Sequence, residues 1–223
     1  MKDNKINLIK NESKSNNNLS QKRKIVFGQV ATCLAVFFAL WLMVEMDHAS
    51  LIDDPVRNAV ISMRSEWLTP LMKVITYMGN WQFITAVCLV LLLISKTRIT
   101  YGVPLSIGAL FVSLANKGIK AIVMRPRPDA AMFLIEQGGW SFPSGHSITS
   151  MFFYGMAIWL IRRNLKDCRL ANVLTALLAI PMILIGVSRV YLGVHYPTDV
   201  LAGWSLGAAV IAIFSITIIK KSA

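Results

Sequence analysis

Cysteine and histidine are both rare in this sequence, with three of each among 223 residues. The three cysteines, Cys33, Cys88 and Cys168, are odd in number and have no CxxC spacing, which disfavours a disulfide framework. Too few histidines and carboxylates lie near one another to complete a metal coordination shell. We therefore expect neither a metal ion nor another cofactor.

Charged residues are scarce as well, at 15%, whereas 55% of the residues are hydrophobic and the mean hydropathy is +0.57. This composition excludes an ordinary soluble domain. Apolar runs long enough to cross a hydrocarbon core of roughly 30 Å occur at 25–46, 101–124, 171–187 and 200–219. Two shorter runs, 81–95 and 147–161, reach that length only with help from 71–80 and from Gly145. The sequence thus predicts an all-α integral membrane protein with six transmembrane helices.

Acidic residues are the scarcer charge, at 11 against 23 lysines and arginines. Placing residues 1–24, the turn 96–98, the loop 162–169 and Lys220–Lys221 on one side collects fifteen basic and three acidic residues. The other side then carries eight of each. Because cytoplasmic loops retain positive charge, we expect both termini in the cytoplasm and a multi-pass protein of the plasma membrane. Attraction to anionic lipid explains the basic surplus, so we expect the bilayer as partner and no nucleic acid.

Two segments outside the expected spans have their own character. Residues 1–24 have little apolar surface, which predicts a disordered basic cytoplasmic tail before a membrane domain at 25–221. Between the first two spans, Asp54 is expected to cap an interfacial helix with Pro55 in its first position. His48, Asp53 and Asp54 are interpreted as solvated loop or cap residues without a chemical role.

Chemically versatile residues gather in three stretches that are expected on the outer side. In "KAIVMRPRP" a helix carrying Lys117 and Lys120 ends before Arg125 and Arg127. Arg189 closes the fifth span within "SRVYLGVHYPTD". Ionisable groups at membrane depth are costly and usually mark a functional site.

The third stretch, "SFPSGHS", opens a hydrophobic helix. Pro143 breaks the incoming loop, Ser144 can cap the helix or bond an oxygen, and Gly145 lets an anion approach the free N–H groups. His146 is then held near whatever binds there. An ordinary capped helix explains Ser144 but leaves the histidine unexplained.

His195 and Asp199 suit nucleophilic chemistry. A carboxylate bonded to one imidazole nitrogen fixes the tautomer and leaves the other nitrogen free to attack phosphorus. The pair is a weak pattern by itself, because half of a metal site or a satisfied boundary pair has the same spacing.

Together the three stretches resemble the tripartite motif of the type-2 phosphatidic acid phosphatase superfamily, including its bacterial membrane lipid phosphatases. The matching elements are Lys-x6-Arg-Pro at 120–128, Pro-Ser-Gly-His at 143–146 and Ser-Arg-x5-His-x3-Asp at 188–199. The resemblance implies a metal-independent hydrolase acting on undecaprenyl diphosphate, phosphatidylglycerol phosphate or phosphatidate. A phosphotransferase using the same histidine and a lipid or phosphate transporter are the alternatives.

The resemblance also implies roles for individual residues. His195 would be the nucleophile, Asp199 would orient it, and His146 would act as general acid and then base. The phosphoryl oxygens would be held by Lys120, Arg127, Ser144, Gly145 and Arg189. Whether Lys117 and Arg125 touch substrate stays open, since a snorkelling lysine and an arginine on a headgroup are equally compatible with the sequence.

The final span carries Gly203-x-x-x-Gly207. Two small residues on one helical face allow close helix packing, within this chain or across a homodimer, and the contact within the chain is favoured. The sequence leaves open a monomer or a homodimer.

Overall fold

The computed structural model describes the backbone of residues 2–221 and the side chains of residues 20–218 other than Lys22. The regular secondary structure in this part of the chain is all helical, with no strand, as predicted. Two short irregular helices, η1 (Arg98–Gly102) and η2 (Ala130–Met132), interrupt the α-helical order. The α-helices are α1 (Lys2–Glu45), α2 (Ser50–Ser62), α3 (Leu68–Tyr77), α4 (Trp81–Leu93), α5 (Ser95–Thr97), α6 (Val103–Val123), α7 (Gly145–Asn164), α8 (Cys168–Tyr191) and α9 (Pro197–Lys221).

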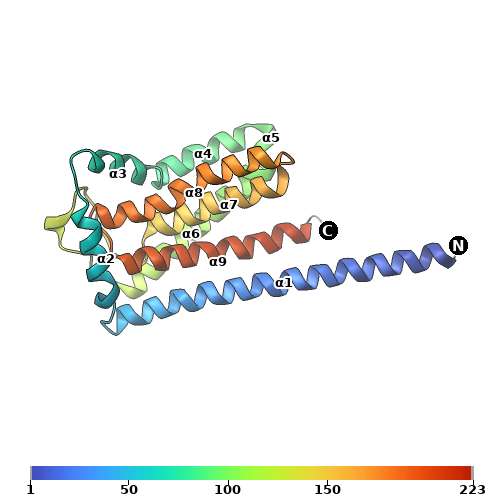
Figure 1. The fold of residues 1–223 in the computed structure, drawn as a ribbon, viewed down its shortest axis with the longest axis horizontal. Helices are drawn as coiled ribbons and strands as arrows, with labels where there is room; N and C mark the ends of the chain where they lie inside the picture. The colour runs from blue at the N-terminus through green and yellow to red at the C-terminus, as the bar shows by residue number, and fades with distance from the viewer. Residues whose placement is uncertain (1, 222–223) are drawn as a thin grey trace.

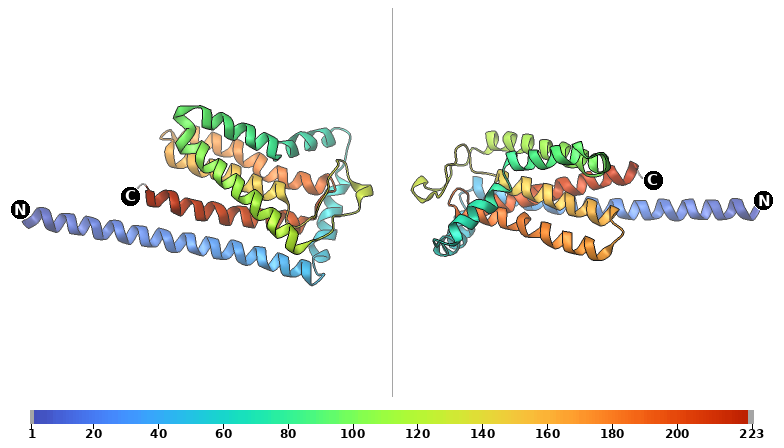
Figure 2. Two further views of the ribbon diagram at one scale, coloured as in Figure 1. Left: turned by 180° about the vertical axis from the view of Figure 1, so that it is seen from behind. Right: turned by 90° about the horizontal axis from the view of Figure 1, so that it is seen from above.

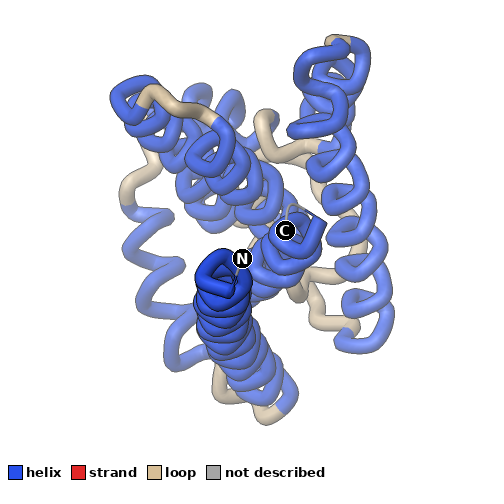
Figure 3. Tube along the Cα trace, turned by 90° about the vertical axis from the view of Figure 1, so that its right-hand side faces the viewer, coloured by secondary structure: helices blue, strands red, loops and turns tan. Residues whose placement is uncertain are grey.

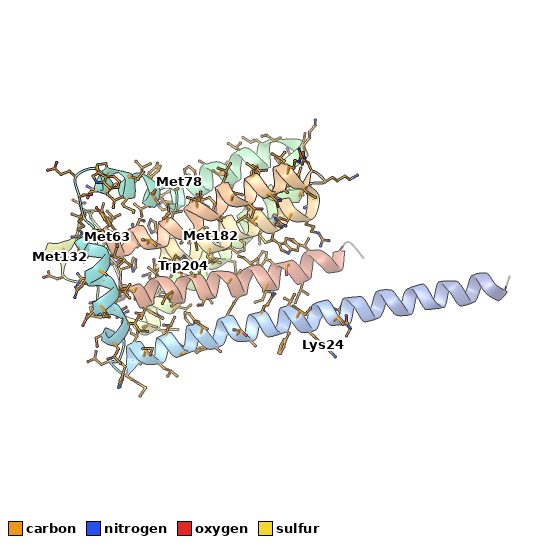
Figure 4. The ribbon with its side chains drawn as sticks, viewed as in Figure 1. Lys24, Met63, Met78, Met132, Met182 and Trp204 are labelled. Atoms are coloured by element: carbon orange, nitrogen blue, oxygen red, sulfur yellow. The ribbon has the colours of Figure 1, made fainter. Side chains whose placement is uncertain are left out.

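The long helices run side by side, and α2 lies across one end of them (Figures 1 and 2). Seen along the helices, α1 stands at the side of the bundle next to α9 (Figure 3). Met63 and Met132 lie at the end that carries α2, whereas Lys24 lies toward the other (Figure 4). The α9 terminus, α5 and the α7–α8 connection share that other end with the start of α1 (Figure 1). The basic segments that the charge count placed together are therefore on one side.

Four helical stretches are long and apolar enough to cross a membrane, namely Arg23–Glu45, Ser95–Val123, Cys168–Tyr191 and Pro197–Ile218. They coincide with the four clear runs of the sequence. The 20-residue α7 packs against α6, α8 and α9, and its inward face includes the buried Ser147 and Ser150. Its surroundings are protein rather than lipid, which explains why it is less apolar than the others.

The second predicted span is divided into two helices. Helices α3 and α4 together are long and apolar enough to span, but the chain bends by 49° between them. Asn80 has extended backbone at the break, and a Cβ on Gly79 would lie 2.6 Å from Ile185 Cγ2 and 3.2 Å from His146 Cδ2. The glycine allows α8 and His146 to pack closely against the bend.

The prediction for the start of α2 was wrong. The helix begins at Ser50 after Ala49 rather than at Asp54, and Pro55 lies inside it. Backbone N–H groups of Ile52 and Asp53 already bond to the carbonyl of Ala49, so the first turn forms before the proline is reached. Helix α2 lies across the end of the bundle (Figure 1), and its position at the membrane interface stays a prediction.

Helix α1 includes residues 2–24, so their backbone is helical, and the predicted disorder of this segment stays a prediction. Adding residues to an existing helix requires far less free energy than starting one. The apolar part from Arg23 onward, which is long enough to cross a membrane, can therefore serve as the template for this extension.

The glycine pair of α9 packs within the chain, as favoured from the sequence. A Cβ on Gly203 would lie 2.8 Å from the carbonyl oxygen of Ser144, and one on Gly207 would lie 2.8 Å from Met151 Cβ. Both contacts are with α7 or the residue that caps it. The close approach brings the first turns of α7 and α9 together.

Replacing Gly203 by alanine is expected to destabilise the protein by about 1–3 kcal/mol, because backbone atoms of α7 cannot move aside as a flexible side chain would. Gly118→Ala in α6 is the matched control, since nothing lies within 4 Å of the added methyl group. Thermal unfolding in detergent measures both variants. Equal unfolding temperatures would show that α7 and α9 are not tightly packed here.

Candidate active site

The start of α7 is built as a capped helix N-terminus. Ser144 is the N-cap, and its fully buried hydroxyl oxygen accepts bonds from the Ser147 N–H at 3.4 Å and the Ser147 hydroxyl at 2.9 Å. The backbone N–H of Ser144 donates to the carbonyl of Asp199 at 3.0 Å, which joins α7 to α9. Gly145 and His146 are the first two residues of the helix, where backbone N–H groups have no partner within a helix.

His195 and Asp199 lie side by side in the protein interior. His195 Nδ1 is 3.1 Å from Asp199 Oδ2, and the two residues are 2% and 0% exposed. Asp199 Oδ2 also accepts a bond from the backbone N–H of Tyr196 at 3.0 Å and one from the Ser141 hydroxyl. The carboxylate is held from several directions, so the imidazole has one preferred orientation.

The other nitrogen of His195 faces a cation. Arg127 Nη1 lies 3.1 Å from His195 Nε2, and a guanidinium can only donate, so Nε2 accepts and the proton resides on Nδ1. Burial lowers the pKa of His195 and the charges of Arg189 and Arg127 act in the same direction, against the opposing effect of Asp199. The imidazole is therefore neutral at neutral pH, with a free electron pair on Nε2.

Two of the residues expected to bind phosphate, Lys120 and Arg127, donate hydrogen bonds to carbonyl oxygens of the loop before α7. Lys120 Nζ donates to the carbonyl oxygens of Trp140 and Ser141. Arg127 donates to the carbonyls of Gly138, Gly139, Trp140 and Val194 besides its contact with His195. The cations at the end of α6 and just after it thus share the carbonyl of Trp140.

Arg189, at the end of α8, completes the positive group. Its Nη1 donates to Thr76 Oγ1 at 2.8 Å, and its Nη2 donates to Gln137 Oε1. The side chain is 1% exposed, and its Nε has no hydrogen-bond partner. A buried donor without a partner is costly, so this N–H is available to an anion.

His146 is half-buried and contacts the break between α3 and α4. Its Nε2 lies 2.5 Å from Asn80 Oδ1, which as a carbonyl oxygen accepts. His146 and Arg189 line one cavity of about 340 Å³.

Asp53 was wrongly interpreted as a solvated residue, whereas His48 and Asp54 are exposed as expected. Asp53 is 1% exposed and accepts a bond from Arg125 Nη2 at 2.6 Å. Arg125 Nη1 bonds to Asp199 Oδ1 at 2.7 Å, so the arginine links two buried carboxylates instead of lying on a lipid headgroup. Burial alone would lower the pKa of Arg125, but Asp199 and Asp53 outweigh it and raise that pKa.

Lys117 is exposed, one turn before Lys120 on α6. It lines a groove of about 740 Å³ between α4 and α6 that also includes Asn116, Gly145 and His146. The rest of the groove is largely apolar, from Trp81, Ile84, Leu89, Leu92, Ala109 and Leu110. The groove therefore extends from the start of α7 along the side of the bundle.

The structure brings all eight predicted site residues to the end of the bundle that carries α2, from α6 to α9 and the loops between them. Sequence reasoning missed the residues that hold them, which are Asp53, Thr76, Asn80, Gln137 and Ser141. Only Ser141 stands within a stretch that the sequence singled out. Among the residues with described side chains, no three His, Cys, Asp or Glu residues gather as metal ligands would.

Comparison with known proteins identifies the family. The family description "PAP2 superfamily" matches residues 83–222, which confirms the resemblance inferred from the motifs. Phosphatidylglycerophosphatase B of Bacillus subtilis strain 168 is 31% identical over 179 residues, covering 77% of this chain and 85% of that protein. An undecaprenyl-diphosphatase of Sulfolobus acidocaldarius is 31% identical over 123 residues, covering 53% of this chain and 55% of that protein.

A solved structure is similar over most of the chain. The crystal structure of a transmembrane PAP2-type phosphatidylglycerolphosphate phosphatase from Bacillus subtilis superimposes with a TM-score of 0.76 at 27% sequence identity. The match covers 87% of this chain and 96% of the other. The arrangement of helices described above is thus shared with a membrane enzyme.

Proposed function

The chain belongs to the PAP2 superfamily, whose lipid phosphatases are hydrolases of phosphate monoester and diphosphate bonds, and we propose that it dephosphorylates a membrane lipid through a phosphohistidine on His195. One observation carries this proposal. The unprotonated Nε2 of His195 faces Arg127, while Asp199 holds the proton on Nδ1. Such a nitrogen is a nucleophile placed where an anion would be attracted.

In the proposed reaction, His195 Nε2 attacks phosphorus and the bond from phosphorus to the leaving oxygen breaks. Protonated His146 gives its proton to that oxygen and so acts as general acid. A water molecule then attacks the phosphohistidine, and His146 takes the proton from this water. The phosphorus–nitrogen bond breaks, phosphate leaves, and both histidines return to their starting states.

The oxygens of the transferred group need positive charge, because phosphoryl transfer depends on positioning and charge neutralisation. Lys120, Arg127 and Arg189 supply three cations in the proposed complex, and the free N–H groups of Gly145 and His146 supply the helix N-terminus. The hydroxyl oxygen of Ser144 caps the helix, which leaves its hydrogen to donate to an oxygen. No metal is needed for this arrangement.

A lipid substrate fits the shape of the molecule. The groove between α4 and α6 runs from His146 to Leu92, and the residues from Trp81 to Leu92 span about 16 Å of helix, close to half of a hydrocarbon core. We propose that the lipid tail enters sideways through this groove while the headgroup reaches the cations. Lys117 would lie at the rim of this path.

The orientation in the membrane follows from the same proposal. Six spans result if α1, the α3–α4 pair, α6, α7, α8 and α9 each cross the bilayer. The basic loops and both termini would then face the cytoplasm, and the site would open on the outer face of the plasma membrane. The names of the relatives suggest phosphatidylglycerol phosphate or undecaprenyl diphosphate as substrate, and phosphatidate is the third candidate.

Phosphate release by the purified protein is the test. The three candidate lipids are presented in detergent with and without a chelator, and we expect turnover of at least one with a rate that the chelator leaves unchanged. A requirement for added divalent metal would contradict the proposal that Lys120, Arg127 and Arg189 neutralise the phosphoryl oxygens. Passage of the phosphoryl group to a lipid or sugar acceptor, without free phosphate, would identify a phosphotransferase.

A further inference from the structure

The link between Asp53 and the site goes beyond the family motifs. Asp53 lies on α2, which crosses the bundle end, whereas Asp199 lies in the first turn of α9 (Figure 1). The two carboxylates contact opposite ends of one guanidinium, at 2.6 Å and 2.7 Å. The face of Arg125 also stacks on the ring of Tyr196, 4.0 Å from its centroid. Arg125 is therefore fixed on three sides.

Asp53 also holds the start of α9 directly. Its Oδ1 accepts from the Thr198 N–H at 2.8 Å, and its Oδ2 accepts from the Thr198 hydroxyl at 2.9 Å. Thr198 is the second residue of α9, where an N–H lacks a partner within the helix. A carboxylate from a different helix thus caps the turn that carries Asp199.

We propose that Asp53 and Arg125 are positioning residues, which hold Asp199 against His195 and set the charge balance around the imidazole. This inference rests on the proposed function of His195. Neither residue lines the cavity shared by His146 and Arg189, since both face a separate cavity with Glu45 and Asp47. They act on the reaction through Asp199 and do not touch the substrate.

The charges around His195 give the two residues opposite effects. Asp199 and, behind it, Asp53 favour protonation of the imidazole, whereas Arg125, Arg127, Arg189, Lys120 and His146 when charged disfavour it. Removing the negative charge of Asp53 makes the surroundings more positive, so His195 is protonated only at lower pH. Removing the charge of Arg125 leaves two carboxylates uncompensated, so His195 is protonated at higher pH.

The experiment compares kcat, KM and the pH profile of kcat/KM for the wild type, Asp53→Asn and Arg125→Gln with one substrate. We expect kcat to fall about 10- to 100-fold in both variants, with little change in KM, because the phosphate-binding groups are intact. The acidic limb should move to lower pH in Asp53→Asn and to higher pH in Arg125→Gln, by roughly half a unit to one unit. Asp54→Asn, the exposed neighbour on α2, is the matched control and should behave as the wild type.

Arg125→Lys separates charge from geometry. A lysine keeps the positive charge but cannot bridge two carboxylates, so the acidic limb should return toward the wild-type position while kcat stays low. Shifts of both limbs in the same direction, or unchanged limbs in folded variants, would overturn the inference. Thermal unfolding and gel filtration identify folded variants, and an inactive wild type would contradict the proposed function instead.

Discussion

Replacing His195 by alanine is expected to lower phosphate release by at least about a thousandfold, because the proposed nucleophile is the Nε2 atom that lies against Arg127. The substrate should still bind, since Lys120, Arg127 and Arg189 remain. A phosphoenzyme that is labelled from substrate and stable to alkali should form in the wild type and be absent from the variant. The measurement combines steady-state phosphate release with alkali-quenched labelling.

His195 is buried, so the alanine variant removes a partner from Asp199 as well as a nucleophile. His195→Asn avoids this difficulty, because the side-chain amide N–H of asparagine lies near the position of Nδ1 and can still donate to the Asp199 carboxylate. The exposed His48→Ala is the control for histidine replacement elsewhere on the same side. Substantial turnover by His195→Asn would contradict the nucleophilic role, and retained lipid movement would favour a transporter.

Removing His146 should have the second-largest effect, and its size should depend on the leaving group. A lipid diphosphate expels a phosphate monoester, which leaves more readily than the alkoxide expelled from phosphatidate or phosphatidylglycerol phosphate. General acid catalysis contributes typically 10²–10⁴-fold. We expect His146→Ala to lose about that much on the monophosphate lipids and clearly less on undecaprenyl diphosphate.

The comparison is made as a ratio of kcat/KM between substrates, which cancels partial unfolding of the variant. Asn80→Ala adds a second probe, because the side chain of Asn80 orients the His146 ring and is not one of the residues proposed to bind phosphate. It should reduce turnover in the same substrate order but by a smaller factor. Equal losses on mono- and diphosphate lipids would show that His146 does not protonate the leaving oxygen.

Prediction from the sequence succeeded where a property depends on nearby residues. The four apolar runs became helices long enough to span a membrane, and Gly145 begins α7. The motif residues also lie at the same end of the bundle, because each of them is in the last or first turn of a helix or in a loop next to it. Where a helix forms, starts and ends depends largely on nearby residues, so these features can be predicted from the sequence.

Other features of the fold depend on contacts between distant segments. The α3–α4 bend depends on Ile185 and His146, which pack against Gly79 from α8 and α7. The lower hydropathy of α7 follows from its central position, which no feature of residues 145–164 reveals. Both depend on what packs against the segment, and packing is decided only when the bundle forms.

Asp53 and Arg125 show most clearly what cannot be predicted from the sequence. By itself the sequence determined a membrane protein of the PAP2 superfamily, with two histidines, an aspartate and a set of cations in three stretches. Only the tertiary structure decided that Asp53, 72 residues from Arg125 and 146 from Asp199, is buried in the same cluster. The local sequence around a carboxylate near a helix start is the same whether the carboxylate faces water or an arginine. Its burial is decided by groups that are far away in the chain.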